Sequence, residues 1–159
     1  MRPPRLSLTT MQALLEWYRV NLCRAHFVDP RGFRVRFILP DFVHFIKLTN
    51  KYGEEPRNKR KAIEEIRRGR MEFAAGRFDP QRASELSWIP QLVTEPDFIC
   101  RNWQILGEGD ECYVRNFAAA REPGDYRVLV SKRIGTVRQA ITMFERDIGG
   151  KERALQVWP

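Results

Sequence analysis

The first regular pattern along the chain is helical. Apolar residues recur every three or four positions, which places one buried stripe along a helix; they are Met11, Leu14, Leu15, Tyr18 and Leu22. Thr9 and Thr10 precede this run, and threonine is a residue that caps helix N-termini. We expect the helix to end near the turn sequence 29–32, which reads Asp-Pro-Arg-Gly.

A strand and a second helix are predicted next. Over residues 33–39, apolar side chains alternate with Arg34 and Arg36, which gives a strand one apolar face and one cationic face. Pro40 and Asp41 then open a helix whose apolar residues share one side, and His44 lies near the edge of that side. These apolar residues are Phe42, Phe45 and Ile46.

Residues 54–70 are almost entirely charged. Three pairs of opposite charge are spaced four residues apart, as on the surface of a solvated helix; they are Arg60 with Glu64, Lys61 with Glu65, and Glu64 with Arg68. Two interpretations stay open, a salt-bridged surface helix and an electrostatic funnel for nucleic acid. The paired glutamates weaken the positive field and slightly favour the first.

Another helix is predicted to start at Asp79 and Pro80, because aspartate caps helices and proline suits the first helical position. Ala83, Leu86 and Ile89 are expected to point inward along it. The helix must end or kink before Pro90, which cannot continue the hydrogen-bonding pattern.

The C-terminal half reads as four successive strands, over residues 99–106, 111–118, 126–132 and 136–144. Turn sequences at 107–110 and 123–125 make short connections, which favour antiparallel pairing. Helices followed by such a meander predict an α+β fold, with N-terminal helices packed on a C-terminal four- to five-stranded antiparallel sheet. At 159 residues, the chain fits one domain.

Charge and composition narrow the range of candidate partners and compartments. The net charge is +8, carried mainly by arginine, and such an excess favours a polyanion, although a basic surface without a specific partner also fits. No apolar run is long enough to span a bilayer, and no secretory signal is visible at the N-terminus. Cys23, Cys100 and Cys112 are odd in number and unpaired in spacing, so we expect reduced cysteines and a cytoplasmic protein, with delivery into another cell left open.

Most standard catalytic patterns are missing from the sequence. There is no nucleophile elbow, no phosphate-binding glycine loop, no dinucleotide fingerprint and no carboxylate cluster with metal-ligand spacing. Cys23 and His26 could share a zinc ion, but no second pair of ligands stands nearby. We therefore expect neither a metal nor a cofactor. RNA suits the remaining set of His, Arg, Lys, Thr and Tyr, because its own 2′-hydroxyl is a nucleophile.

Several short segments, in order along the chain, carry a family resemblance. They are Phe42 to Phe45 (FVHF), Phe78 to Ile89 (F-D-x-x-R-A-x-x-apolar-x-W-I), Glu95 to Ile99 (EPDFI), Tyr113, Val128 to Val130, and Ala140 to Phe144 (AITMF). This order resembles the phage-associated nuclease-like domains of the barnase–EndoU–colicin–RelE superfamily, whose last strand often reads FVTAY. The resemblance covers residues 33–148 and leaves 1–32 as an N-terminal helical extension and 149–159 as a tail or short closing element.

The resemblance implies RNA cleavage by transesterification to a 2′,3′-cyclic phosphate. Carried over by position, His44 would transfer protons, Arg82 would polarise the scissile phosphate, and Thr142 would hold a phosphate oxygen or orient the histidine. Three further residues are implied on the neighbouring strands: Arg115 and Lys132 for phosphate contact, and Tyr113 for base stacking or proton transfer.

The three proposed catalytic residues also have purely structural interpretations. His44 could be a surface or capping histidine, Arg82 could pair with Glu85 or Glu95, and Thr142 is a common strand residue. The apolar Met143 and Phe144 and the charged segment 54–70 depart from the family pattern. They would also fit a protein that kept the fold and lost the activity.

Three functions follow as hypotheses. The first is a metal-independent endoribonuclease that acts on structured RNA such as tRNA or mRNA, in a phage, toxin or effector setting. The second is a non-catalytic nucleic-acid-binding module that uses the same basic face. The third is a protein-binding module with an acidic partner, such as an inhibitor or immunity protein.

Overall fold

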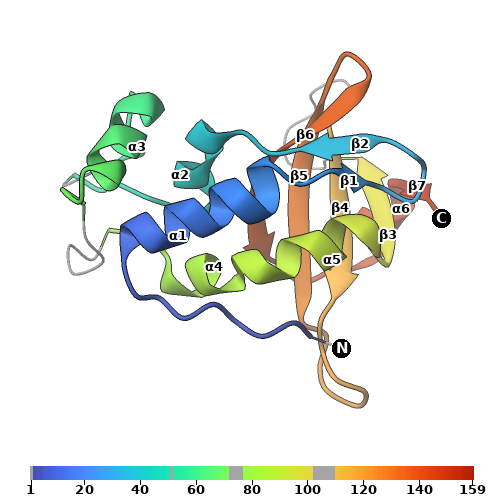
Figure 1. Cartoon of the computed structure of the whole chain (residues 1–159). Helices are drawn as coiled ribbons and strands as arrows, with labels where there is room; N and C mark the ends of the chain where they lie inside the picture. The colour runs from blue at the N-terminus through green and yellow to red at the C-terminus, as the bar shows by residue number, and fades with distance from the viewer. Residues whose placement is uncertain (1, 51, 72–76, 102–109) are drawn as a thin grey trace. The chain divides into compact units, whose positions relative to one another are not determined.

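The computed structural model describes residues 2–50, 52–71, 77–101 and 110–159. The chain divides into two compact units (Figure 1). The sheet unit comprises Met1–Pro4, His26–Arg36 and Trp88–Pro159, and the helical unit comprises Arg5–Ala25 and Phe37–Ser87. All strands of the described chain belong to the sheet unit, together with helices α5 and α6. Helices α1 to α4 belong to the helical unit.

The predicted first helix is confirmed. Helix α1 spans Met11–Tyr18 and continues as a π-helical segment over Arg19–Cys23. The side chain of Thr10 accepts a hydrogen bond from the backbone N–H of Ala13 at 3.0 Å, which satisfies one of the free donors at the helix start.

The other helices described in the helical unit are short. They are α2 (Phe42–Phe45), preceded by a 3₁₀ turn at Leu39–Asp41, then α3 (Lys59–Arg67) and α4 (Pro80–Ser84). The helix expected at Asp79 and Pro80 starts there and gives way to a 3₁₀ turn at Glu85–Trp88, followed by α5 at Ile89–Thr94. Pro90 therefore stands in the first turn of a new helix, where its missing N–H costs nothing.

Aromatic rings make up the centre of the helical unit. The ring centroid of Tyr18 lies 5.3 Å from that of Phe42 and 5.7 Å from that of Phe45, and both pairs are inclined. The hydroxyl of Tyr18 donates to the carbonyl of Ile38 at 3.0 Å, so this buried phenol is satisfied. This packing fixes α2, and with it His44, against α1.

The sheet unit contains the predicted antiparallel meander. Strand β3 (Phe98–Arg101) pairs with β4 (Glu111–Asn116), β4 with β5 (Tyr126–Ile134), and β5 with β6 (Val137–Glu145). The predicted strand over 99–106 is described only as far as Arg101; the rest of it and most of the turn at 107–110 lie outside the described residues. The α+β class is confirmed.

The predicted size and pairing of the sheet are wrong. Within the described residues, the sheet has seven strands in the order β1-β2-β6-β5-β4-β3-β7, and β2 (Arg34–Arg36) pairs with β6 in parallel. Strand β1 (Phe27–Val28) adds one edge, and β7 (Gln156–Trp158) adds the other beside β3. Arg34 lies opposite Val137, and a pairing between residues so distant in sequence leaves no local signal. The helices are also not confined to the N-terminal side, because α6 (Gly150–Ala154) follows the meander.

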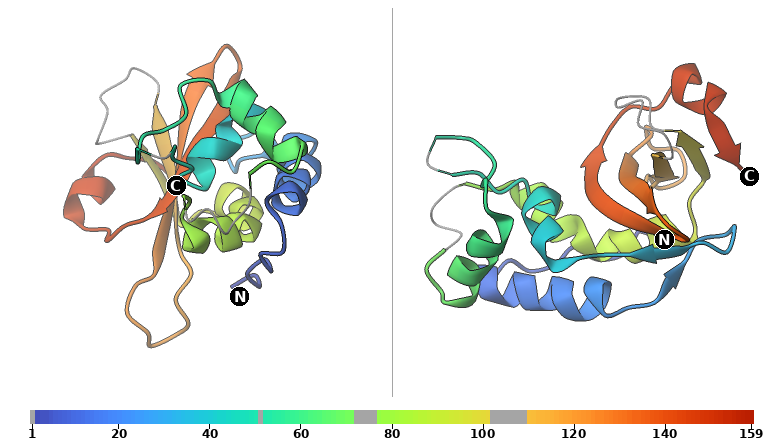
Figure 2. Two further views of the ribbon diagram at one scale, coloured as in Figure 1. Left: turned by 90° about the vertical axis from the view of Figure 1, so that its left-hand side faces the viewer. Right: turned by 90° about the horizontal axis from the view of Figure 1, so that it is seen from above.

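The sheet is curled (Figure 2). One of its faces carries a compact apolar cluster. Its buried members are Phe98, Cys100, Cys112, Val114 and Val128. Cys100 and Cys112 lie directly opposite each other on β3 and β4, and all three cysteines are free thiols, as expected. Helix α5 packs on β1, β4 and β5, and α6 packs on β3. Within the described residues, no helix has the length and apolar character needed to cross a bilayer.

Candidate functional site

A tight turn after α2 brings distant polar residues to His44. The side chain of Asn50 accepts hydrogen bonds from the backbone N–H groups of Tyr52 at 2.8 Å and Glu54 at 3.0 Å. Asn58 then caps α3 by accepting from the N–H of Lys61 at 3.0 Å. The chain thereby returns past α2 and starts a new helix beside it, since α2 and α3 are in contact.

Four side chains meet at this point and are called the His44 cluster: Asp41, His44, Glu55 and Lys59. His44 Nδ1 lies 2.8 Å from a carboxylate oxygen of Glu55. On its other side, His44 Nε2 contacts the ammonium group of Lys59. That ammonium also lies 3.5 Å from the carboxylate of Asp41. Asp41 is nearly buried, whereas the side chains of His44 and Lys59 are 28% and 31% exposed.

The surroundings of His44 favour the neutral form of its imidazole. Partial burial is the main reason that its pKa lies below the ordinary value of 6.5, and the positive charge of Lys59 lowers it further. Glu55 and Asp41 oppose this shift without cancelling it. In the neutral tautomer that fits both contacts, Nδ1 donates to Glu55 and Nε2 accepts from Lys59.

This geometry is suited to proton transfer beside an anion. A carboxylate on Nδ1 orients the imidazole and stabilises it once Nε2 has taken up a proton. An ammonium group next to Nε2 stabilises negative charge on a substrate oxygen at the same place. The cluster therefore combines a base of lowered pKa with a cation, and solvent reaches both.

Arg82 lies in the same unit as His44, at the start of α4. The side chain of Asp79 accepts from the backbone N–H of Arg82 at 3.1 Å, and the Arg82 guanidinium lies 3.8 Å from the Asp79 carboxylate. The backbone N–H of Asp79 donates to the carbonyl of Ile46 at 2.8 Å, which joins the start of α4 to the end of α2. Glu85, one of the partners considered for Arg82, pairs with Arg5 at 2.8 Å.

The other residues implied by the resemblance belong to the sheet unit. Tyr113 on β4 is fully buried, and its hydroxyl donates to the carboxylate of Asp29 at 2.8 Å. Burial and this contact raise the pKa of the phenol. Its ring therefore offers no surface on which a base could stack, and its hydroxyl holds the sheet to the turn at Asp29.

Arg115, Thr142 and Lys132 are placed on three different strands. The Arg115 guanidinium donates to the carbonyl of Glu95 and lies 3.7 Å from its carboxylate, so it connects β4 with the loop after α5. Thr142 on β6 lies opposite Val130 of β5, and Lys132 lies opposite Gln139 and is exposed. None of these three belongs to the unit that contains His44.

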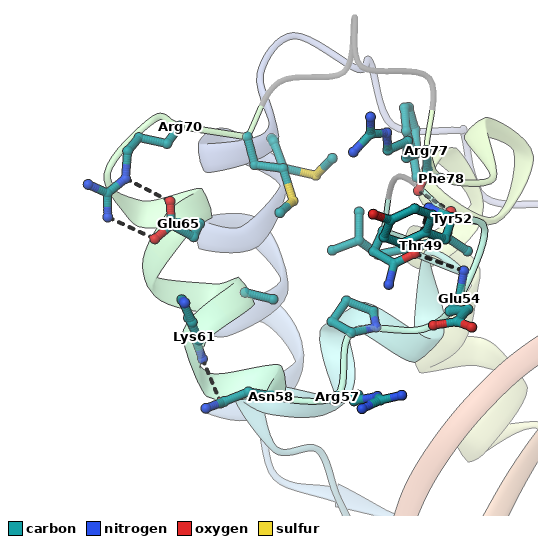
Figure 3. Close-up of a pocket in the computed structure, with 16 residues that line it drawn as sticks. Thr49, Tyr52, Glu54, Arg57, Asn58, Lys61, Glu65, Arg70, Arg77 and Phe78 are labelled. Carbon is teal, nitrogen blue, oxygen red and sulfur yellow. Dashed lines mark hydrogen bonds and ion pairs between the residues drawn. The ribbon is translucent and has the colours of Figure 1, made fainter.

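The helical unit also contains a pocket of about 630 Å³ (Figure 3). Residues from the segment 54–61 form one part of its wall, and residues that follow α2 or precede α4 form another. Its lining residues include Leu48, Thr49, Tyr52, Glu54, Arg57, Lys61, Arg77 and Phe78. Glu55 and Lys59, which come from the same segment 54–61, contact His44. The segment 54–61 thus contributes to the pocket wall and also supplies two members of the His44 cluster.

The sequence pattern singled out His44 but not its partners. Glu55 and Lys59 are 11 and 15 residues further along, a spacing that no single helix or strand brings together. The only sequence signal was that the charged segment begins shortly after α2. Comparisons of the chain with protein-family models, with curated proteins and with solved structures give no match.

Proposed function

We propose that this chain is a metal-independent endoribonuclease in which the His44 cluster transfers protons and stabilises charge. The observation that carries the proposal is the pair of contacts on His44: Glu55 at Nδ1 and Lys59 at Nε2. RNA cleavage through the 2′-hydroxyl needs a base, a cation near the phosphate and a polyanion-binding surface. The cluster provides the first two, and the net charge of +8 supports the third.

The proposed reaction is a transesterification. Unprotonated Nε2 of His44 takes the proton of the 2′-hydroxyl, the 2′-oxygen bonds to phosphorus, and the bond from phosphorus to the 5′-oxygen breaks. The 5′-oxygen takes up a proton from water, and the other fragment ends in a 2′,3′-cyclic phosphate. Lys59 turns from Nε2 to the non-bridging phosphate oxygens, where negative charge develops.

The resemblance to the barnase–EndoU–colicin–RelE superfamily leads to the same reaction, and the α+β class is compatible with it. Arg82 remains a proposed phosphate ligand, because it lies on the helix whose start is bonded to the end of α2. The roles of Thr142, Arg115 and Lys132 remain proposals that rest on the resemblance alone. The substrate that we propose is structured RNA, such as tRNA.

The test is incubation of the purified protein with total tRNA in EDTA, followed by analysis of the fragment ends. We expect 2′,3′-cyclic phosphate ends. An RNA oligonucleotide with one 2′-deoxy nucleotide at the mapped site should resist cleavage there, while its all-ribo counterpart is cut. Cleavage of both oligonucleotides at that site would contradict the proposed nucleophile.

The rival functions give different results in the same experiment. A non-catalytic RNA-binding module would retain RNA affinity and produce no fragments. A protein-binding module would lose its RNA affinity at modest salt and show no preference for RNA over other polyanions. Intact RNA in every reaction would therefore contradict the endoribonuclease, and the salt dependence of binding would separate the two alternatives.

A further inference from the structure

We infer that the pocket of the helical unit binds one unpaired nucleotide, with its base on Tyr52 and its phosphate on the surrounding cations. The role of this nucleotide as part of an RNA substrate rests on the proposed function. The ligand chemistry of the pocket is argued separately, from its shape, its aromatic wall and its charge.

The size and composition of the pocket suit a small amphipathic ligand. Its volume of about 630 Å³ lies within the range of pockets for small molecules and cofactors. Tyr52, Thr49 and Phe78 lie together on one side, and Lys61 and Glu65 of α3 lie on the opposite side (Figure 3). A planar ring can therefore lie on an aromatic wall while its polar substituents face α3.

Tyr52 presents an unusually exposed aromatic ring. It is 75% exposed, although a tyrosine on an ordinary surface usually packs much of its ring. Its backbone is fixed by the turn at Asn50, where Gly53 adopts a φ of +77° that other residues rarely tolerate. A ring held at the rim of a pocket by a rigid turn is a stacking platform for a nucleobase, and stacking tolerates any base.

The charge at the pocket favours a phosphate. Four cationic residues line it, and one of them, Arg70, is bonded to Glu65 at 2.7 Å. Within the described ranges, Arg57, Lys61 and Arg77 have no carboxylate partner. The one other carboxylate of the described lining, Glu54, leaves an excess of positive charge. Guanidinium and ammonium groups bind phosphate through charge-assisted hydrogen bonds.

The position of the pocket relates the nucleotide to catalysis. Along the segment 54–61, Glu55 and Lys59 contact His44, whereas Glu54, Arg57 and Lys61 line the pocket. A nucleotide in the pocket thus places its sugar-phosphate backbone beside the residues that hold the imidazole. The pocket would select a single-stranded or looped RNA, since a base within a duplex cannot stack on Tyr52.

The experiment is calorimetric titration of the intact protein with adenosine 5′-monophosphate, adenosine and inorganic phosphate in separate runs. We expect adenosine monophosphate to bind about tenfold more tightly than either part. Tyr52→Leu should weaken its binding about tenfold, whereas Tyr52→Phe, which keeps the ring, should leave it within about twofold. Lys61→Gln should weaken binding of the monophosphate and not of adenosine. Arg68→Gln, at the C-cap of the same helix and outside the pocket lining, is the matched control.

The outcomes separate this inference from the proposed function. If Tyr52→Leu and Lys61→Gln weaken nucleotide binding, the pocket assignment is supported even when no RNA is cleaved. In that case only the endoribonuclease proposal is contradicted. Cleavage of RNA without measurable binding of the monophosphate overturns the proposal that the pocket binds a nucleotide. The endoribonuclease proposal is then still supported. Equal affinity for inorganic phosphate and the monophosphate, unchanged by Tyr52→Leu, also overturns it.

Discussion

Two groups of charged side chains in this protein differ in a way that bears on their roles. The sheet unit holds an arginine network around Asp29, in which Arg31 bridges Asp29 at 2.8 Å and Glu111 at 3.0 Å. Arg138 lies 3.1 Å from Glu111 and donates to the hydroxyl of Ser131 at 3.2 Å. The helical unit holds the His44 cluster, with a histidine at its centre and no arginine.

Burial and ionisation separate the two groups. Asp29 is completely buried, and the side chain of Arg138 is 4% exposed, so water and substrate cannot reach them. Arginine also does not lose its proton at any pH that the protein tolerates. His44 and Lys59 are partly exposed, and an imidazole, unlike a guanidinium, can gain and lose a proton; burial and Lys59 lower the pKa of His44 and favour its unprotonated form. The first group is suited to hold the sheet together, and the second is suited to chemistry.

Among these charged residues, Arg138 is expected to contribute most to the stability of the fold. Arg138→Ala should lower the free energy of unfolding by about 1.5–3 kcal/mol, because it takes a buried cation from Glu111, which then keeps Arg31, and a donor from Ser131. Chemical denaturation followed by circular dichroism measures this loss. The matched control is Arg133→Ala, since Arg133 lies opposite Arg138 across β5 and β6 but is exposed, and its effect should stay within about 0.5 kcal/mol. Equal losses of unfolding free energy in the two variants would show that the buried network stabilises the protein no more than an exposed arginine does.

Removing the cation of the His44 cluster should affect the reaction and not the fold. Lys59→Gln should slow RNA cleavage about 100-fold by removing charge stabilisation at the phosphate. Its unfolding midpoint should shift by little, because the side chain is 31% exposed. Arg60→Gln, an exposed cation at the next position of α3, should cleave at the wild-type rate. If both variants lose activity equally, general attraction of RNA by α3 explains the result instead.

The pH dependence of cleavage also distinguishes the His44 cluster from the arginine network, whose arginines do not change their charge with pH. We expect the cleavage rate to change by about tenfold or less. The rate should rise as pH increases through the lowered pKa of His44, since the base must be unprotonated. Lys59→Gln removes a charge that lowers this pKa and should move the rise to higher pH; Glu55→Gln removes one that raises it and should move the rise to lower pH. If the pH–rate profiles of both variants coincide with that of the wild type, the ionisation of His44 does not control the rate of cleavage.

The same lowered pKa has a small consequence for stability. The folded protein binds a proton at His44 less readily than the unfolded chain does, because the folded pKa lies below 6.5. Its contribution to stability is therefore complete above pH 6.5 and decreases as the pH falls below that value. His44→Gln should flatten this part of the stability curve, as measured by denaturation between pH 5 and 8. A curve of unchanged shape would place the pH dependence in other groups.

Local signals in the sequence predicted the local structure well. Thr10 and Asp79 cap helices where threonine and aspartate were expected to do so, and the meander follows from alternating residues and short turns. The parallel pairing of Arg34 with Val137 was missed, because no short-range sequence pattern predicts which distant strand β2 pairs with. The strand at Gln156–Trp158 was missed for the same reason.

The candidate site was predictable only in part. His44 was singled out by position, but its chemistry depends on Glu55 and Lys59, which a turn at Asn50 returns to it. Tyr113 illustrates the opposite error, since a strand residue with a reactive hydroxyl can equally be a buried link to Asp29. Exposure and partners decide between such roles, and neither can be read from residue identity.

The most direct test of the account compares the two histidines of the chain. Cleavage of tRNA in EDTA is measured for the wild type, His44→Ala and His26→Ala, with the unfolding midpoint of each variant determined on the same preparation. We expect His44→Ala to slow cleavage by about 10²–10⁴-fold while it stays folded, and the exposed His26 to be replaceable without loss. Equal cleavage by folded His44→Ala and the wild type would contradict the assignment of the reaction to the His44 cluster.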